Sequence, residues 1–99
     1  MAARPDPEPV ARQRLDKWIW FARVVKTRSL AAGLIKAGHV RVNGTKIDAP
    51  SRAVKVGDVL TIALERQVRV LKILSCGDRR GPYEEARRLY EELSEPKSP

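Results

Sequence analysis

The sequence contains a single cysteine, a single histidine and no long apolar run, and each scarcity excludes a class of function. With Cys76 alone the chain can form neither an internal disulfide nor a cysteine-based metal cluster, which favours a reducing compartment. Nothing near His39 completes a catalytic triad or a zinc site, and no glycine-rich phosphate loop is present. No apolar segment approaches the roughly 20 residues that cross a bilayer, and residues 1–9 lack the apolar stretch of a signal peptide. We therefore expect a soluble, cytoplasmic, non-catalytic protein with no cofactor, no metal and no membrane partner.

Positive charge is concentrated in one part of the chain. Nine of the 20 Lys and Arg residues fall between Arg12 and Lys46, where Asp16 is the only one of the 12 acidic residues. This segment therefore carries a formal charge of +8, which equals that of the whole 99-residue chain. A cationic surface this localised on one small domain predicts a polyanionic partner, most often nucleic acid, whether RNA or DNA.

The first half of the sequence predicts two helices that pack as a hairpin. Residues 1–11 contain three prolines and are expected to form a disordered leader. Thr27 is a candidate N-cap for the second helix, and Gly38 is expected to end it. Apolar residues recur at intervals of three and four in both helices, as is typical of amphipathic helices. These apolar residues are Leu15, Trp18, Ile19, Ala22 and Val25 in the first helix, and Leu30, Leu34 and Ile35 in the second.

The second half changes to an alternating pattern that is typical of strands. Val40 and Val42 flank a charged residue, and Asn43-Gly44 is a strong signal for a two-residue turn, so we expect a β-hairpin that continues to Ile47. Residues 54–64 and 68–74 predict two further strands. Helical spacing returns over residues 83–93. The expected fold class is therefore α+β: a two-helix hairpin, a small and mostly antiparallel sheet, and a C-terminal helix.

Candidate phosphate-binding residues gather on the two expected helices and the first hairpin. Arginine offers a planar fork of donors to phosphate oxygens, lysine offers a mobile point charge, and the start of a helix adds backbone N–H groups. The candidates are Arg14, Lys17, Arg23, Lys26, Thr27, Arg28, Ser29, Lys36, Arg41, Asn43 and Lys46. Any one of these cations could be a solvated surface charge, but their clustering favours a shared role.

Three further residues of the first helix have roles that its period suggests. Trp18 falls on the apolar stripe and is expected in the core, whereas Trp20 projects about 100° or more away from it. Trp20 could stack on a base beside Arg23, or pack beneath the C-terminal helix or the sheet. Asp16 lies in the first turn of the helix, where a carboxylate interacts favourably with the positive end of the helix dipole. Arg23 follows about two turns later. We therefore expect a structural role for Asp16.

At these residues the sequence resembles a known family. Arg14-Leu15-Asp16, Thr27-Arg28-Ser29 and Gly38-His39-Val40-Arg41-Val42-Asn43-Gly44 are similar to the small RNA-binding domain named after the fourth protein of the small ribosomal subunit, the S4 domain. Within that superfamily, the tryptophan-rich run from Arg14 to Trp20 and the later Arg79-Arg80-Gly81-Pro82 look like the branch of bacterial heat-shock protein fifteen. The chain then divides into a leader (1–11), an RNA-binding domain (12–75), and a polar loop, helix and frayed end (76–99).

The resemblance implies that the helical hairpin and the following β-hairpin form one RNA-binding surface. The branch associates with the large ribosomal subunit, notably when it retains a nascent chain on tRNA, and assists its recycling. The implied partners are ribosomal RNA, the large subunit and peptidyl-tRNA, bound by a monomer. Two alternatives stay open: the RNA-docking part of an RNA-modifying enzyme, against which the start at Met1 and the lack of a catalytic domain weigh, and a protein-interaction adaptor that uses the Glu-rich C-terminal helix.

Overall fold

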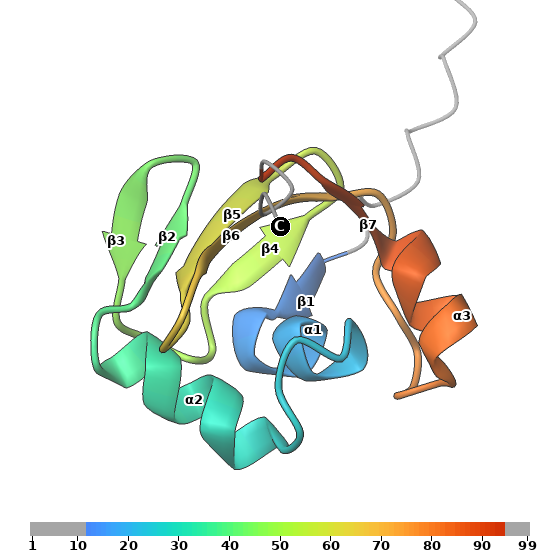
Figure 1. The fold of residues 1–99 in the computed structure, drawn as a ribbon, viewed down its shortest axis with the longest axis horizontal. Helices are drawn as coiled ribbons and strands as arrows, with labels where there is room; N and C mark the ends of the chain where they lie inside the picture. The colour runs from blue at the N-terminus through green and yellow to red at the C-terminus, as the bar shows by residue number, and fades with distance from the viewer. Residues whose placement is uncertain (1–11, 95–99) are drawn as a thin grey trace, which may run out of the picture.

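The computed structural model describes residues 12–94, in which two helices pack against a five-stranded sheet (Figure 1). The disordered leader expected over 1–11 lies outside the described residues, as does all but Ser94 of the end expected to fray, 94–99. In chain order the elements are β1 (Arg12–Arg14), α1 (Leu15–Phe21), α2 (Arg28–Lys36), β2 (Val40–Val42), β3 (Thr45–Ile47), β4 (Ala53–Lys55), β5 (Val59–Ala63), β6 (Val68–Ile73), α3 (Tyr83–Ala86), the 3-10 turn η1 (Arg87–Leu89) and β7 (Tyr90–Glu92).

Helix α1 is shorter than its apolar stripe predicts, because the backbone turns at Arg23. That residue adopts a φ of 61°, and the N–H groups of Arg23 and Val24 donate to the carbonyls of Trp20 and Ile19. This pair of bonds is a Schellman motif, which ends the helix. Val25, which we expected on the helical stripe, therefore lies in the loop, partly buried against the core.

Helix α2 begins and ends where the sequence predicts. Thr27 is extended, and its hydroxyl oxygen accepts a hydrogen bond from the N–H of Leu30 at 3.1 Å. Gly38 has a φ of 84°, which favours glycine, and its N–H donates to the carbonyl of Ile35. The buried face differs from the prediction: Ala31 and Ile35 are buried, whereas Leu30 is 53% exposed.

The sheet has the order β3-β2-β5-β6-β7, and every pair in it is antiparallel, as expected. Asn43 and Gly44 have φ values of 51° and 85°, so both central residues of the first hairpin adopt the positive φ that a tight two-residue turn requires. Strands β5 and β6 confirm the two strands predicted after the hairpin. Strands β1 and β4 form a separate two-stranded sheet, in which Gln13 pairs with Val54.

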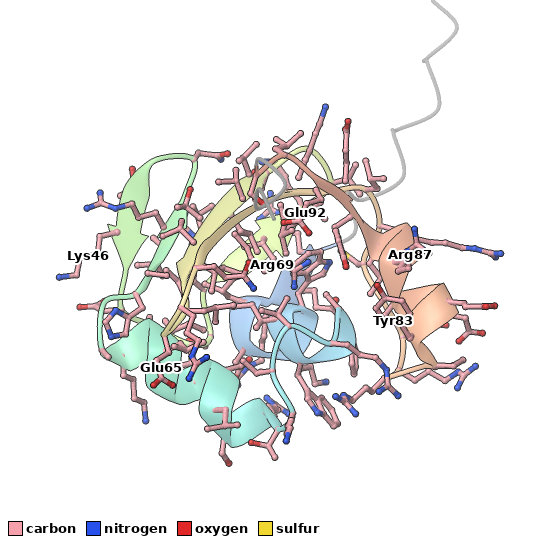
Figure 2. The ribbon with its side chains drawn as sticks, viewed as in Figure 1. Lys46, Glu65, Arg69, Tyr83, Arg87 and Glu92 are labelled. Carbon is pink, nitrogen blue, oxygen red and sulfur yellow. The ribbon has the colours of Figure 1, made fainter. Side chains whose placement is uncertain are left out.

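The predicted C-terminal helix over residues 83–93 is wrong beyond its first turn. Helix α3 is short, η1 follows it, and β7 then pairs antiparallel with β6. Cross-strand contacts favour the strand here. Arg69 of β6 donates to Glu92 at 2.5 Å (Figure 2). The guanidinium of Arg69 also lies over the ring of Tyr90, with 5.5 Å between the guanidinium carbon and the ring centroid. A helix over the same residues would forfeit both contacts.

The hydrophobic core lies between the helices and one face of the sheet. Its fully buried large side chains are Trp18, Leu15, Ile19, Ile35, Leu60, Ile62, Leu71, Ile73, Val40 and Val54, so the core position predicted for Trp18 is confirmed. The Trp18 indole N–H donates to the carbonyl of Ser75 at 2.9 Å. The Gln13 amide donates to and accepts from the backbone of Gly77. The segment after β6 is therefore bonded to the first strand and the first helix.

Candidate nucleic-acid interface

Asp16 joins the starts of the two helices. Its carboxylate is 4% exposed and accepts two hydrogen bonds from Arg14, from Nε to Oδ1 and from Nη2 to Oδ2, both at 3.0 Å. Arg28, the first residue of α2, places its Nε 3.4 Å from Oδ2. Asp16 thus has the structural role that we expected, although Arg23 is not its partner. One buried carboxylate holds two arginines side by side, and both arginines still expose a large part of their surface (48% and 39%).

The carboxylate of Asp16 stays ionised at neutral pH. Burial on its own would raise the pKa of Asp16, but hydrogen bonds from Arg14 and from the Lys17 N–H, together with the charge of Arg28, hold that pKa below its ordinary value. The same hydrogen bond raises the pKa of Arg14. A single negative charge therefore neutralises one of two adjacent guanidinium groups, and the cluster keeps a net positive charge that is fixed in place.

The start of α2 adds further donors beside this cluster. Lys26 and Ser29 are exposed, and the first turn of α2 contains no acidic residue. The hydroxyl oxygen of Thr27 is engaged in the cap, which leaves its hydrogen to donate to a ligand. Backbone N–H groups and the helix dipole favour an anion at this end of a helix. The structure therefore brings together five of the predicted residues here: Arg14, Lys26, Thr27, Arg28 and Ser29.

A second group of predicted cations lies on the first hairpin and at the end of α2. Arg41 and Lys46 are exposed and directly opposite each other in the β2–β3 ladder. Arg41 Nη1 donates to the carbonyl of Gly44 at 3.3 Å, so its charged end turns toward the hairpin loop. Lys46 projects outward from β3, and its side chain also lies against Gly38 (Figure 2). Lys36 is exposed in the last turn of α2.

Asn43 lies in the β2–β3 turn and has a structural role there, because its side chain bonds to the turn that precedes β5. Its amide donates to Asp58 Oδ1 at 3.1 Å, and its carbonyl oxygen accepts from the N–H of Val59 at 2.9 Å. Lys55 donates to the same carboxylate from Nζ at 3.0 Å. Burial would raise the pKa of Asp58, but the bonds from Lys55 and Asn43 lower it. The phosphate contact predicted for Asn43 remains a prediction, as does that of the half-buried Lys17.

Arg23 lies apart from both groups. Its side chain turns toward the loop before α3, where Nε donates to the carbonyl of Gly81 at 2.7 Å. A positive φ costs a residue with a Cβ about 1 kcal/mol or more, and glycine is the usual residue at this position of a Schellman motif. The chain therefore keeps an arginine where local backbone energetics favour glycine.

Sequence reasoning did not select Arg80 as a site residue. Its Nε and Nη2 donate to the carbonyls of Trp20 at 3.2 Å and Val25 at 3.3 Å, and its guanidinium carbon lies 5.8 Å from the centroid of the Trp20 ring. Trp20 is half-buried, and its ring also meets that of Phe21 at 5.4 Å. Trp20 thus packs against the loop before α3, and not beneath a C-terminal helix. The Arg79-Arg80 pair was the only sequence feature that pointed to this contact. It lies about sixty residues from Trp20, so nothing in the sequence connected the two.

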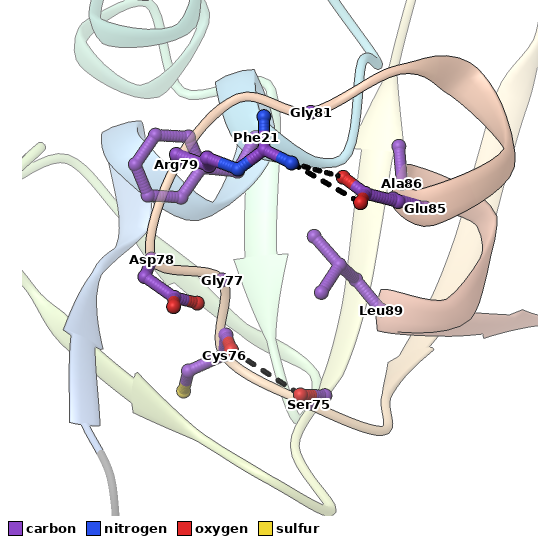
Figure 3. A pocket seen from close by; sticks show the side chains of 10 residues that line it. All are labelled: Phe21, Ser75, Cys76, Gly77, Asp78, Arg79, Gly81, Glu85, Ala86 and Leu89. Atoms are coloured by element: carbon purple, nitrogen blue, oxygen red, sulfur yellow. Dashed lines mark hydrogen bonds and ion pairs between the residues drawn. The ribbon is translucent and has the colours of Figure 1, made fainter.

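A pocket of about 370 Å³ opens between α1 and α3 (Figure 3). Phe21, Cys76 and Leu89 are among its lining residues, and Arg79 bonds Glu85 beside it at 2.9 and 3.1 Å. None of the residues predicted to bind phosphate lines this pocket. Within residues 12–94, no group of three His, Cys, Asp or Glu side chains is placed to hold a metal ion, and no helix has the length and apolar content to cross a membrane.

The fold and the clustered cations define a class of protein. Two short helices with a following β-hairpin, and arginines at the starts of both helices, are found where the S4 domain family matches the chain, over residues 13–60. The S4 domain is an RNA-binding domain. The sequence resemblance to it is therefore confirmed, and so is the α+β fold with its antiparallel sheet.

Comparison with individual proteins narrows the class. Heat shock protein 15 of Escherichia coli (strain K12) is 39% identical over 88 residues, which are 89% of this chain and 65% of the relative. The heat shock protein 15 homolog of Aeromonas salmonicida is 38% identical over 89% of this chain and 67% of its own length. This chain belongs to the heat shock protein 15 family. It spans about two thirds of the length of these relatives.

A solved structure supports the same relationship. Vibrio cholerae heat shock protein 15 superposes with a TM-score of 0.79 at 37% identity, and the match covers 85% of this chain and 84% of the other. The Vibrio protein is trimeric in that structure, which questions the monomer that we expected for this chain.

Proposed function

We propose that this chain is a non-catalytic, cytoplasmic protein that binds ribosomal RNA on the large ribosomal subunit and assists the recycling of subunits that retain a nascent chain on tRNA. The observation that carries the RNA contact is the pair Arg14 and Arg28, held on the carboxylate of Asp16 at the start of α2. The ribosomal part of the proposal rests on the similarity to heat shock protein 15.

The paired guanidinium groups suit adjacent phosphates of an RNA backbone. Each guanidinium presents donors in a rigid plane, and a bidentate contact to a phosphate is stronger and more directional than a contact from lysine. Arg41 and Lys46 supply a second point of contact on the hairpin, because both cations are exposed on neighbouring strands and neither has a carboxylate partner within residues 12–94. A-form RNA hides its base edges in a deep groove, so we expect recognition through backbone shape and 2′-hydroxyl groups.

Co-sedimentation with purified ribosomal subunits tests the proposal. We expect the protein to travel with large subunits, more strongly when they carry peptidyl-tRNA, and to leave the bound RNA chemically unchanged. Equal association with small and large subunits at physiological salt would contradict the ribosomal assignment and leave general RNA binding. Modified or cleaved RNA after incubation would instead favour the alternative of a part of an RNA-modifying enzyme.

The salt dependence of the RNA affinity tests whether the cationic groups form the interface. Neutralising about 4 to 6 phosphates releases about 0.7 to 0.9 counterions each, so the slope of log affinity against log salt should lie near −3 to −5. An apolar protein interface, as in the adaptor alternative, gives a slope near zero. A fluorescence titration of a labelled RNA hairpin at several salt concentrations distinguishes these two results.

Matched substitutions test the position of the interface. Arg28→Ala or Arg14→Ala should weaken RNA binding by about 1 to 3 kcal/mol, as expected for the loss of a charged hydrogen bond. Arg87→Ala is the control, because Arg87 contacts Tyr83 beside α3, at the end of the molecule opposite β3 and Lys46 (Figure 2). Equal losses from all three variants, with unchanged thermal melts, would show that the interface is not localised at the starts of the helices.

A further inference from the structure

Arg80, Trp20 and Arg23 form a second cluster that the first interface does not use, hereafter the stacking cluster. It joins the end of α1 to the loop before α3, two segments that are about sixty residues apart in the sequence. Both arginines are fixed through neutral acceptors: Arg23 donates to the carbonyl of Gly81, and Arg80 donates to the carbonyls of Trp20 and Val25. A carbonyl orients a guanidinium without cancelling its charge.

No carboxylate within residues 12–94 pairs with either arginine of the stacking cluster, whereas Arg14, Arg28, Arg69 and Arg79 are all paired with acids. Two full positive charges are therefore held in place, and that of Arg80 lies over the half-exposed indole of Trp20. The position of Arg23 adds an independent sign of function, because its φ of 61° is strained for a long side chain such as arginine. An arginine at that position adds its charge to the cluster at a cost in backbone energy.

We propose that the stacking cluster binds an unpaired nucleotide of the RNA. The base would stack on the guanidinium of Arg80, which is supported from beneath by the ring of Trp20, and the neighbouring phosphate would contact Arg23. Paired bases are stacked on one another and offer no free face, whereas the bases of loops, bulges and ends stack on aromatic rings and on guanidinium planes. This inference rests on the proposed function and assigns the kind of RNA that the same protein prefers.

The position of the cluster fits a single continuous RNA. Arg80 donates to the carbonyl of Val25, and Val25 precedes Arg28 by three residues, so the Cα atoms of Val25 and Arg28 lie no more than about 11 Å apart. An RNA helix whose backbone lies on Arg14 and Arg28 can therefore place an adjoining loop or bulge on the stacking cluster. The protein then prefers a junction between duplex and single strand over a plain duplex.

Three RNA probes with one common duplex test this proposal: a blunt hairpin, the same hairpin with a short adenosine extension, and the same hairpin with an abasic extension of equal phosphate number. For the wild-type chain we expect affinity for the adenosine extension to exceed that for the abasic extension by about tenfold, as one or two stacked bases provide. The tryptophan emission should change only with adenosine, and this reports Trp20 because Trp18 has no exposed surface.

Arg80→Lys is the decisive variant, since lysine keeps the charge and lacks the planar face. We expect Arg80→Lys to bind the adenosine and abasic probes equally and to keep its affinity for the blunt hairpin. Trp20→Leu should likewise lose the preference for adenosine. Arg87→Lys, the control, should keep the tenfold preference. Each ratio compares two RNAs on one protein, so a partial loss of folded protein cancels. A wild-type chain without the preference, or variants that retain it, would overturn the inference. Failure to bind any probe, blunt hairpin included, would overturn the proposed function instead.

Discussion

Replacing Asp16 by asparagine separates two roles of charge at the interface, namely its amount and its placement. The substitution makes the interface more positive, which on its own should tighten RNA binding. It also replaces one of the two carboxylate oxygens by an NH2 group, which cannot accept a hydrogen bond. At Oδ2 this group would face Arg14 Nη2, now at 3.0 Å, and Arg28 Nε, now at 3.4 Å. At Oδ1 it would face Arg14 Nε, now at 3.0 Å, and the N–H of Lys17, now at 2.8 Å, so either orientation sets donors against donors. We therefore expect both side chains to lose their fixed positions.

The magnitudes decide which effect is larger. An arginine side chain carries about 2 kcal/mol of rotamer entropy, and if Asp16 has removed half of it, releasing two arginines costs RNA binding about 2 kcal/mol. Removing a negative charge close to phosphates gains about 0.5 to 1 kcal/mol in a well-hydrated setting. The net expectation for Asp16→Asn is RNA binding weaker by about 1 to 1.5 kcal/mol, or about five- to tenfold, despite the extra positive charge.

The same substitution should also destabilise the fold. Hydrogen bonds to a buried charge contribute about 1.5 to 3 kcal/mol each, but the arginines are half in water and part of that is screened, so we expect a loss of about 2 kcal/mol of unfolding free energy. Fluorescence titration with an RNA hairpin and urea denaturation measure the two effects. Glu92→Gln is the matched control, because it changes the charge equally and also releases an arginine, Arg69 of β6. Tighter binding by Asp16→Asn than by the wild type would refute the reasoning and show that the number of cations alone sets the affinity.

Three further predictions concern stability. The pKa of Asp16 is lower in the folded chain than in the unfolded chain, so the stabilisation it gives is complete above a pH of about 4 and is lost as the pH falls through the folded value. Urea midpoints below about pH 4 should therefore fall less for Asp16→Asn than for the wild type. Thr27→Ala should cost about 1 kcal/mol by removing the cap of α2, and Thr27→Ser should restore most of it, whereas equal melts for both variants would mean that the cap contributes nothing. Gly38→Ala should cost about 1 to 2 kcal/mol because of its φ of 84°, and an unchanged melting temperature would show that this turn adapts freely.

Much of the fold follows from local signals in the sequence. Thr27 and Gly38 mark both ends of α2 because capping depends on residues within one turn, and Asn43-Gly44 marks the hairpin because few other pairs adopt two positive φ values. The end of α1 does not follow, because an arginine at 23 occupies a position that glycine usually signals. Strand β7 does not follow either, because Tyr90 has helical spacing and its partner strand is far away in the sequence.

The candidate site divides in the same way. The concentration of cations between residues 12 and 46 predicts a phosphate-binding surface, since charge is counted directly from the sequence. The pairing of Arg14 with Arg28 through Asp16 depends on how α1 packs against α2, which no local pattern encodes. The contact of Arg80 with Trp20 depends on the path of a loop about sixty residues further along.

The hydrogen bonds between the N-terminal elements and the segment after β6 determine when, during synthesis, the growing chain can complete its fold. Gln13 cannot form its hydrogen bond until Gly77 has been synthesised, and the indole of Trp18 cannot form its bond until Ser75 has been synthesised. Strand β6 remains an edge strand until β7 has been synthesised. A growing chain in which Arg14, Asp16 and Arg28 have already been synthesised still lacks the tertiary contacts that position α1. The contacts that position α1 are therefore made only after residue 77 has been added, so the RNA-binding surface reaches full strength after that point and not in shorter fragments.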